Sequence, residues 1–389
     1  MTGSTIYTYA WDLAETGVAT ATAQFRGLGL EGVTLATAYH AGKFLRPHGT
    51  GGKVYFPEDG TIYFRPEMAR YGAIRPQVSR VTAERDVLAE LVGSGLPTTA
   101  WTVLNHNSRI GMAHPEHAVA NAFGDRYIYS LCPANPVVRE YGVALCRDLT
   151  DHYAVATLSL ETPGFLPYAH GYHHEFALVK SNPWLENLLG LCFCEHCMAG
   201  ASAAGIDAAG LKQRVARDIH AGLDAEFDMP ADMASAFWLA DVAGDPELSA
   251  FLRWRGEVTT SLVAEIRDGI RPDVELAVIP SVARPTGGAF YEGTDLGALA
   301  AAGIIIEACF YEPSAERVRA DLFDVHRRIG GARLRGIVRP AHPDLASRAE
   351  LIAAVAALRA GGVETISFYN WGHVKRQSLE WIGAALRGQ

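Results

Sequence analysis

The feature that most constrains the fold is a series of apolar, β-rich runs that alternate with amphipathic helical patterns. Each run is almost continuously hydrophobic, which is typical of parallel strands buried on both faces. Helical patterns such as Ala83–Ser94, Asn135–Tyr153 and Pro246–Gly269 lie between the runs. The runs that we interpret as strands are Ile6–Tyr9, Val33–Ala38, Thr99–Leu104, Val155–Leu160, Leu276–Ile279, Ile304–Phe310, Leu334–Arg339 and Thr365–Tyr369.

Eight β-then-α units in series predict an α/β fold, a (β/α)8 TIM barrel that forms a single domain over residues 1–389. The rival fold is an open doubly wound sheet. The count of eight disfavours it, and so does the absence of a glycine-rich phosphate turn after the first run. Helix-end signals agree with the repeat, since Pro136 lies just inside one helix and Gly303 closes another ahead of a strand.

Two insertions interrupt the repeat, at about residues 41–70 and 162–272. In the first, Val54–Phe56 and Thr61–Phe64 flank the turn-like Glu58-Asp59-Gly60, which predicts a β-hairpin. The second follows the fourth strand and contains helices and a cysteine cluster. Both insertions leave the carboxyl ends of strands, which is the catalytic face of a barrel enzyme.

Charge and hydropathy narrow the possible partners and compartment. The net charge of −9 disfavours a nucleic-acid groove or an anionic membrane surface. No apolar run approaches the roughly 18 residues of a membrane span, and the N-terminus lacks a secretory signal pattern. We therefore expect a cytoplasmic protein with no nucleic-acid or membrane partner. A homo-oligomer is an open possibility, with the aromatic hairpin as either a lid or a contact surface.

Three cysteines cluster in LCFCEHCMAG, as C-x-C-x-x-C over Cys192, Cys194 and Cys197. In a reducing compartment such spacing favours metal binding, and Zn²⁺ prefers four thiolates in a tetrahedron. Cys132, in the proline-rich SLCPANP, is the best fourth ligand. The alternatives are a redox C-x-x-C pair and three packed thiols. The remaining cysteines lie inside a helix and a strand and are expected to be core thiols: Cys146 and Cys309.

The segment SLCPANPVVREYGVALCRDL, a strand ending in Glu161, and LCFCEHCMAGASAAGID together resemble the middle of glycoside hydrolase family 42, the zinc-containing β-galactosidases. The resemblance covers about residues 130–207. It implies a barrel with one structural zinc, and it gives Glu161 the acid/base role. The zinc ligands that it implies are Cys132, Cys192, Cys194 and Cys197.

Glu161 is also a candidate on its own chemistry, because it follows the apolar run VATLSL. A carboxyl group at the mouth of an apolar barrel is partly desolvated, which raises its pKa and suits a general acid. Two features depart from the family pattern. Leu160 stands where the family has asparagine, and the seventh strand, RGIVRPAHPD, has no glutamate for a nucleophile. The other carboxylates that could act as the partner are Glu307 on the sixth strand, Asp12 after the first strand and Glu312, and of these we favour Glu307.

Further polar and aromatic residues collect at the strand ends, as a polyhydroxylated ligand would require. Trp371 is expected to be a platform on which a sugar ring stacks. The predicted substrate-binding residues are Asp12, His40, Asn105, His106, Arg109, Tyr168, His173, His174, Tyr311, Arg339, Asn370 and Trp371.

These features predict a carbohydrate-active enzyme that hydrolyses a glycosidic bond of a small sugar or glycoside, with Glu161 as proton donor. Two other functions stay open. One is a metal-dependent sugar isomerase, epimerase or lyase that uses the rim histidines. The other is a sugar-binding barrel without catalysis, which the missing carboxylate on the seventh strand would explain.

Overall fold

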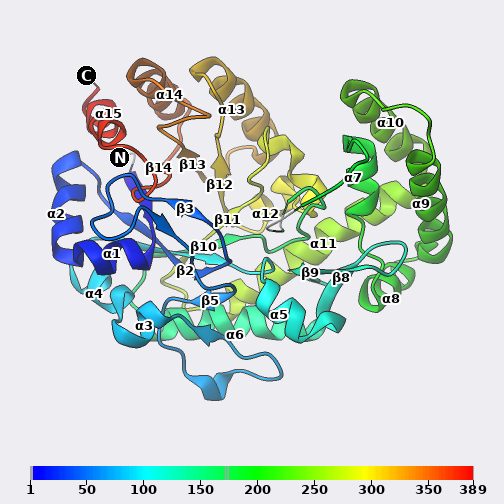
Figure 1. Ribbon diagram of the computed structural model, residues 1–389, viewed down its shortest axis with the longest axis horizontal. Coiled ribbons are helices and arrows are strands. Elements are labelled where there is room, and N and C mark those ends of the chain that lie inside the picture. The colour runs from blue at the N-terminus through cyan, green and yellow to red at the C-terminus, as the bar shows by residue number, and fades with distance from the viewer. Residues whose placement is uncertain (1–2, 171, 173–174, 389) are drawn as a thin grey trace.

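The computed structural model describes residues 3–170, 172 and 175–388, and it contains a closed barrel of eight parallel strands (Figure 1). The TIM-barrel prediction is therefore confirmed. The barrel strands, in order around it, are β1 (Gly3–Thr8), β2 (Val33–Tyr39), β7 (Thr98–Val103), β10 (Thr157–Glu161), β11 (Glu275–Ile279), β12 (Ile305–Cys309), β13 (Leu334–Val338) and β14 (Thr365–Phe368).

The first and last strands close the barrel. Residues 3–6 of β1 pair in parallel with residues 365–368 of β14, and Tyr7 and Thr8 pair with β2. The strands are buried along nearly their whole length, because helices cover them outside and side chains fill the interior.

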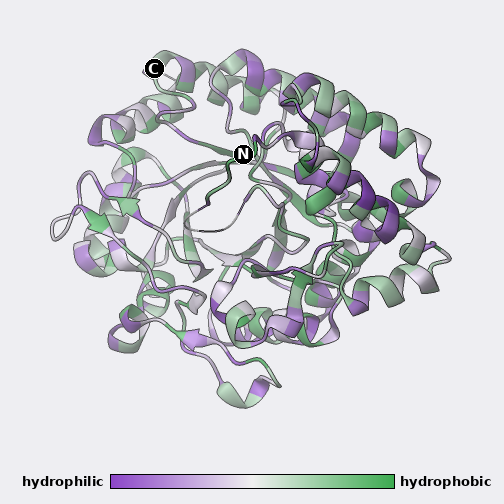
Figure 2. Ribbon diagram, turned by 45° about the vertical axis from the view of Figure 1, so that its right-hand side comes forward, coloured by the Kyte–Doolittle hydropathy of each residue, from purple (hydrophilic) through white to green (hydrophobic). Residues whose placement is uncertain are grey.

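The helices outside the barrel are amphipathic, and Figure 2 shows hydrophobic and hydrophilic residues alternating along them. Side-chain caps begin several of them: Asn135, Asp245, Ser314 and Ser347 each accept a backbone N–H of the first turn. These helices are α1 (Ala10–Thr16), α2 (Val18–Leu28), α3 (Arg80–Glu84), α4 (Val87–Gly93), α6 (Pro136–His152), α11 (Pro246–Gly269), α12 (Leu296–Ala301), α13 (Ala315–Ile329), α14 (Arg348–Ala360) and α15 (Arg376–Arg387).

The insertion after β2 contains a β-hairpin, but between other strands than predicted. Its elements are β3 (Phe44–Leu45), β4 (Val54–Tyr55), β5 (Thr61–Ile62), the 3-10 turn η1 (Met68–Arg70) and β6 (Gln77–Val78). The hairpin joins β3 to β4, whereas β5 pairs antiparallel with Ala38 and Tyr39 of β2. β1 pairs with β2 only as far as Leu35. The backbone groups of β2 beyond Leu35 are therefore left for β5 to pair with.

A third excursion, between β7 and α6, was not predicted. It consists of α5 (Ser108–Ala113), the 3-10 turn η2 (Pro115–His117) and the antiparallel strands β8 (Ala118–Ala120) and β9 (Arg126–Leu131). The loop that joins these two strands contains Gly124, which has a φ of 91°, a backbone conformation that glycine adopts readily because it has no Cβ.

The insertion after β10 builds a lobe beside the barrel, at the right of Figure 1. Its hydrophobic core is separate from that of the barrel and contains Phe193, Trp238 and Phe251. Its helices are α7 (Pro183–Leu189), α8 (Glu195–Ala203), α9 (Ala208–Leu223) and α10 (Ala231–Gly244). The next helix, α11, packs against α6 and so returns the chain to the barrel. Among the described residues, no helix is both long and apolar enough to cross a membrane.

Candidate active site

Glu161 is the last residue of β10, at the carboxyl end of the barrel. Its side chain is buried, and the indole Nε1 of Trp101 donates a hydrogen bond to Oε2 at 2.7 Å. Burial raises the pKa of Glu161 from 4.5 to about 7, although the hydrogen bond from Trp101 favours the ionised form. The group therefore holds a proton close to neutral pH, as a general acid must.

The backbone turns sharply directly after this carboxyl. Thr162 has a φ of 51°, which is a costly conformation for a β-branched residue. Backbone amides hold the turn, because Leu104 N donates to the carbonyl of Glu161 at 3.0 Å and Asn105 N to that of Thr162 at 3.1 Å. Strain of this kind persists where the surrounding structure fixes it, and it clusters at functional sites.

A second buried carboxyl, Glu292, approaches the same region. It ends the 3-10 turn η3 (Thr286–Glu292) after β11, and Ser281 Oγ donates to its Oε1 at 2.5 Å. Burial and the nearby charge of Glu161 raise its pKa to about 8, against the opposing effects of Ser281 and Arg255. The two carboxyl groups are thus close enough for the charge on one to disfavour ionisation of the other.

The chain brings Glu292 to Glu161 through backbone contacts. Ile279 of β11 is the register partner of Glu161, and Ser281, which holds the Glu292 carboxyl, follows two residues later. Phe165 N donates to the carbonyl of Glu292 at 2.8 Å. Gly164 permits this approach, since a Cβ there would lie 2.1 Å from that carbonyl oxygen.

Glu307, the predicted partner carboxylate, points into the barrel interior. Ser159 donates to its Oε2 at 2.6 Å, and Tyr7 and Ser367 donate to Oε1 at 3.1 and 3.3 Å. Ser159 precedes Glu161 by two residues on β10, so Glu307 lies in the layer of side chains below Glu161, roughly 6–7 Å farther from the mouth. Its four lone-pair directions are largely occupied by hydroxyl donors.

Aromatic rings line the mouth next to Glu161. The hydroxyl of Tyr9 is hydrogen-bonded to those of Tyr39 and Tyr369, at 2.9 and 2.8 Å. The ring of Trp101 makes edge contacts with Tyr39 and Tyr369 at centroid distances of 5.0 and 5.9 Å. Neither Trp101 nor Tyr9 is among the predicted site residues. Trp101 faces inward, as its hydrogen bond to Glu161 shows, and Tyr9 lies two residues after Tyr7, which donates to Glu307 inside the barrel.

Two predicted substrate-binding residues, Tyr311 and Arg339, meet at the ends of β12 and β13. The guanidinium of Arg339 lies 3.9 Å from the centre of the Tyr311 ring. Its Nε donates to Asp344 Oδ2, and Arg284 NH2 lies 2.6 Å from the other oxygen of the same buried carboxylate. The carboxylate of Asp344 therefore forms ion pairs with two guanidinium groups.

Asp12 and Arg109 hold the first insertion in place. Asp12 is buried in an ion pair with Arg46 of the insertion, at 2.6 Å. Burial raises the pKa of Asp12 to about 6, although Arg46 lowers it. Arg109 Nε donates to the carbonyl oxygen of Asp59 at 2.7 Å. Both contacts tie the insertion to the rim of the barrel.

Asn105 and Asn370 bond to backbone groups of neighbouring loops. The amide of Asn105 donates to the carbonyls of Pro163 and Gly164, at 2.8 and 3.2 Å, and so supports the turn after Glu161. Asn370 Oδ1 accepts Gly372 N at 3.0 Å. Both side chains are buried, which places them behind the surface of the mouth.

Trp371 is buried away from the mouth. The residue is 3% exposed, its ring makes a T-shaped contact with that of Phe25 on α2 at a centroid distance of 5.4 Å, and its indole N–H donates to Gln24 at 3.2 Å. Little of the ring is left for a stacked sugar.

The rim histidines form a row of rings. His40 stacks on His106 at a centroid distance of 4.1 Å, and His106 meets His170 edge-on at 5.5 Å. Tyr168 is more exposed, at 36%. His173 and His174 lie outside the described residues. Within the described part of the chain, none of the side-chain groups with metal-binding spacing combines these histidines with Glu161 or Glu307.

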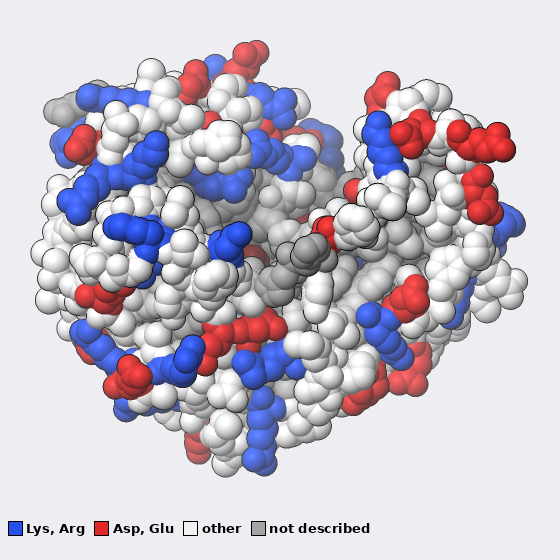
Figure 3. All heavy atoms as spheres, viewed as in Figure 1, with Lys and Arg blue, Asp and Glu red and all other residues white. Residues whose placement is uncertain are grey.

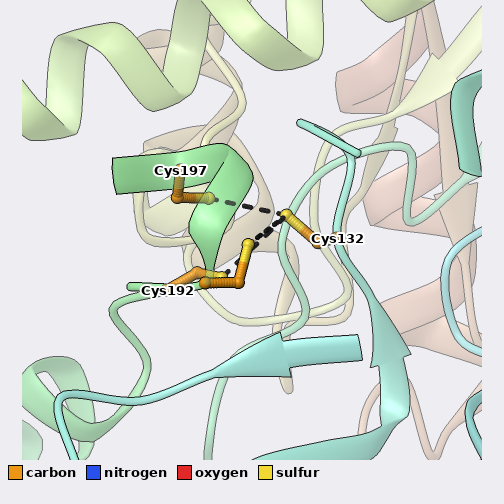
Figure 4. Close-up of side chains that lie close together, drawn as sticks. Cys132, Cys192 and Cys197 are labelled. Atoms are coloured by element: carbon orange, nitrogen blue, oxygen red, sulfur yellow. Dashed lines mark hydrogen bonds between the residues drawn. The ribbon is translucent and has the colours of Figure 1, made fainter. Parts of the chain in front are cut away.

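Four buried cysteines meet between the lobe and the loop before α6 (Figure 4). Cys132 Sγ lies 3.5 Å from Cys194 and Cys197 and 3.9 Å from Cys192. A tetrahedral zinc with bonds of about 2.3 Å would set its sulfur ligands about 3.8 Å apart. The donor set and spacing therefore fit a metal ion such as zinc. Cys146 and Cys309 are buried elsewhere, as expected.

Comparison with known proteins relates the chain to others through its fold alone. No family model matches it, and a search of curated proteins also finds no match. Solved structures do match it. The glycoside hydrolase domain of PgaB (BpsB) from Bordetella bronchiseptica aligns over 99% of both chains, with a TM-score of 0.59 and 14% identity.

Two further solved structures have similar barrels. The catalytic domain of β-amylase from Paenibacillus polymyxa aligns over 98% of this chain and 96% of its own, with a TM-score of 0.58 and 11% identity. The β-galactosidase from the psychrophilic Marinomonas ef1 aligns over 99% of this chain and 59% of its own, with a TM-score of 0.55 and 12% identity. The chain thus shares the barrel fold of several different glycoside hydrolases.

Proposed function

We propose that this protein hydrolyses a glycosidic bond, with Glu161 as proton donor and Glu292 as the second carboxylate. The observation that carries the proposal is the pair of neighbouring buried carboxyl groups at the carboxyl end of the barrel, each with a pKa raised to near neutrality. Such a pair retains one proton between its members near pH 7, which supplies an acid and a base together. The shared fold of glycoside hydrolases supports the same reaction class.

The reaction follows from these positions. Glu161 gives its proton to the glycosidic oxygen while the bond from that oxygen to the anomeric carbon breaks. The pKa of Glu292, about 8, lies above that of Glu161, about 7, so the reactive form is the less populated of two arrangements of the shared proton. In that form Glu161 is protonated, and the ionised Glu292 stabilises the positive charge that develops at the anomeric carbon. Water then adds its hydroxyl to that carbon and returns a proton to the pair. The aromatic wall of Trp101, Tyr39 and Tyr369 offers apolar surface and hydroxyl groups to a sugar ring.

The test compares aryl glycosides that differ in their leaving group. For Glu161→Gln, we expect kcat to fall by about 10³-fold on phenyl glycosides but far less on 2,4-dinitrophenyl glycosides, whose leaving group needs no proton. For Glu292→Gln, we expect a large loss on both. Undiminished kcat in Glu161→Gln would overturn the proposal, and a loss of turnover in Glu307→Gln but not in Glu292→Gln would reassign the second carboxylate.

We also propose that Cys132, Cys192, Cys194 and Cys197 bind one zinc ion. Four thiolates would leave no open coordination position, so the ion would stabilise the structure and take no part in hydrolysis. Cys132 comes from the loop before α6, while the other three come from the segment that starts α8. The ion would thus tie the lobe to the barrel.

A further inference from the structure

The most unusual charge arrangement near the candidate active site is the pair of guanidiniums on one carboxylate. The side chain of Asp344 is fully buried, and Arg339 and Arg284 contact its two oxygens. The two cations and one anion leave this group, which we name the Arg339–Asp344–Arg284 cluster, with a net charge of +1. A single arginine would neutralise Asp344, so the second cation is not needed for that purpose.

Aromatic contacts connect the cluster to Glu161. Arg339 lies over Tyr311, whose ring centre is 6.0 Å from that of Tyr369. The ring of Tyr369 lies 5.9 Å from that of Trp101, which donates to Glu161. Arg339 directly follows β13, and Arg284 lies in the loop after β11, so both belong to the carboxyl end of the barrel. The cluster and the carboxyl pair therefore share one mouth.

Both guanidiniums reach solvent although the carboxylate between them does not. The side chains of Arg339 and Arg284 are 29% and 33% exposed, against 0% for Asp344. Each guanidinium has five N–H donors in a planar fork, and Asp344 can accept only part of them. On the barrel side, at the left of Figure 3, Lys and Arg side chains are more prominent than the Asp and Glu side chains among them, although the whole chain carries a net charge of −9. The local excess of positive charge would attract an anion into the mouth.

We propose that the Arg339–Asp344–Arg284 cluster binds an anionic group of the substrate, so that the sugar beside the scissile bond is acidic. A carboxylate, as in a uronic acid, matches the planar fork of a guanidinium, and a phosphate ester shares the same charge and acceptor chemistry. The proposal rests on the proposed glycosidase function for its catalytic consequence, but anion binding itself does not depend on turnover.

The first experiment measures binding, with Glu161→Gln as a protein that retains the cluster. Glucuronic and galacturonic acid, their neutral counterparts glucose and galactose, glucose 6-phosphate and sodium sulfate are each titrated by calorimetry. We expect the acidic sugars to bind at least 10-fold more tightly than the neutral ones. Preference for the phosphate sugar would identify an ester as the anionic group. Equal affinity for neutral and acidic sugars, binding of sulfate alone, or binding of none of these probes would overturn the proposal.

The second experiment measures selectivity in turnover, as the ratio of kcat/KM for an aryl uronide to that for the matching neutral glycoside. Arg339→Gln and Arg284→Gln should each lower this ratio by about 100-fold, and Arg339→Lys, which keeps the charge but not the fork, by less. Arg217→Gln, which removes an exposed arginine on α9, serves as the matched control and should leave the ratio unchanged. An unchanged ratio in both cluster variants would overturn the proposal.

The two experiments separate the proposals. If Glu161→Gln turns substrates over as well as the wild-type chain but acidic sugars still bind through the cluster, only the catalytic assignment fails. If Glu161→Gln is inactive and neutral sugars bind as well as acidic ones, only the anionic-substrate proposal fails.

Discussion

Burial makes ionisation of Glu161 less favourable in the folded chain than in the unfolded chain. The protonation state of this candidate active-site residue therefore affects folding stability. A pKa raised from 4.5 to about 7 corresponds to about 3 kcal/mol. Because the folded-state pKa is the higher one, this stabilisation is fully present below about pH 4.5 and is lost as the pH rises through about 7.

The raised pKa of Glu161 predicts how the stability of one variant depends on pH. Between about pH 4.5 and pH 8, the free energy of unfolding of the wild-type chain should fall relative to that of Glu161→Gln by about 3 kcal/mol, since glutamine does not titrate. Urea unfolding of both chains at several pH values measures the difference. Glu161→Asp, which still titrates, is the control. Parallel stability curves for the wild-type chain and Glu161→Gln would show that Glu161 ionises freely.

The sequence located some residues of the candidate active site but not others. Glu161 was predictable because it ends an apolar run, and the end of a barrel strand opens on the mouth. Glu292 was not, because it ends a 3-10 turn and reaches the mouth through a hydrogen bond from Phe165, 127 positions earlier in the chain. Trp371 has the right position in sequence but turns outward onto α2, a direction that depends on its packing partners.

At the scale of elements, long patterns predicted the structure better than short ones. All eight barrel strands appear where the apolar runs predict them. The predicted helix Ala83–Ser94 is instead two helices, because Ser79 caps α3 and Asp86 caps α4. The strands of the insertions are only two to six residues long, and their partners are set by which edges of the barrel stay uncovered.

The contact between the turn after β10 and the end of η3 yields a prediction of its own. In Gly164→Ala, the new Cβ would lie 2.1 Å from the carbonyl oxygen of Glu292, so one segment must move. We expect kcat/KM to fall by about 100-fold and the free energy of unfolding by about 1–3 kcal/mol.

The matched control is Gly142→Ala, in helix α6, where nothing lies within 4 Å of the new Cβ. That change should leave activity intact and raise the free energy of unfolding by about 0.5–1 kcal/mol. Wild-type activity in Gly164→Ala would mean that the position of Glu292 relative to Glu161 does not matter for turnover.

At the scale of the whole molecule, the chain has two hydrophobic cores of different origin. The barrel core is built from strands and helices spread over the full sequence, and β1 and β14 close it. The core of the lobe lies mainly within residues 183–254 and includes the four clustered cysteines. The two cores should therefore differ in their dependence on a bound metal.

The zinc proposal predicts this difference directly. Cys132→Ala removes one of four ligands, so we expect it to abolish the binding of about one zinc per chain. Cys146→Ala, which also removes a buried thiol but lies within α6, should keep the metal. Elemental analysis measures the zinc, and limited proteolysis locates the effect. Residues 183–223 should become sensitive in Cys132→Ala while the barrel stays resistant, because metal binding contributes folding free energy only to the elements it joins. Retention of zinc by Cys132→Ala, or equal protease sensitivity of the two variants, would contradict the proposal.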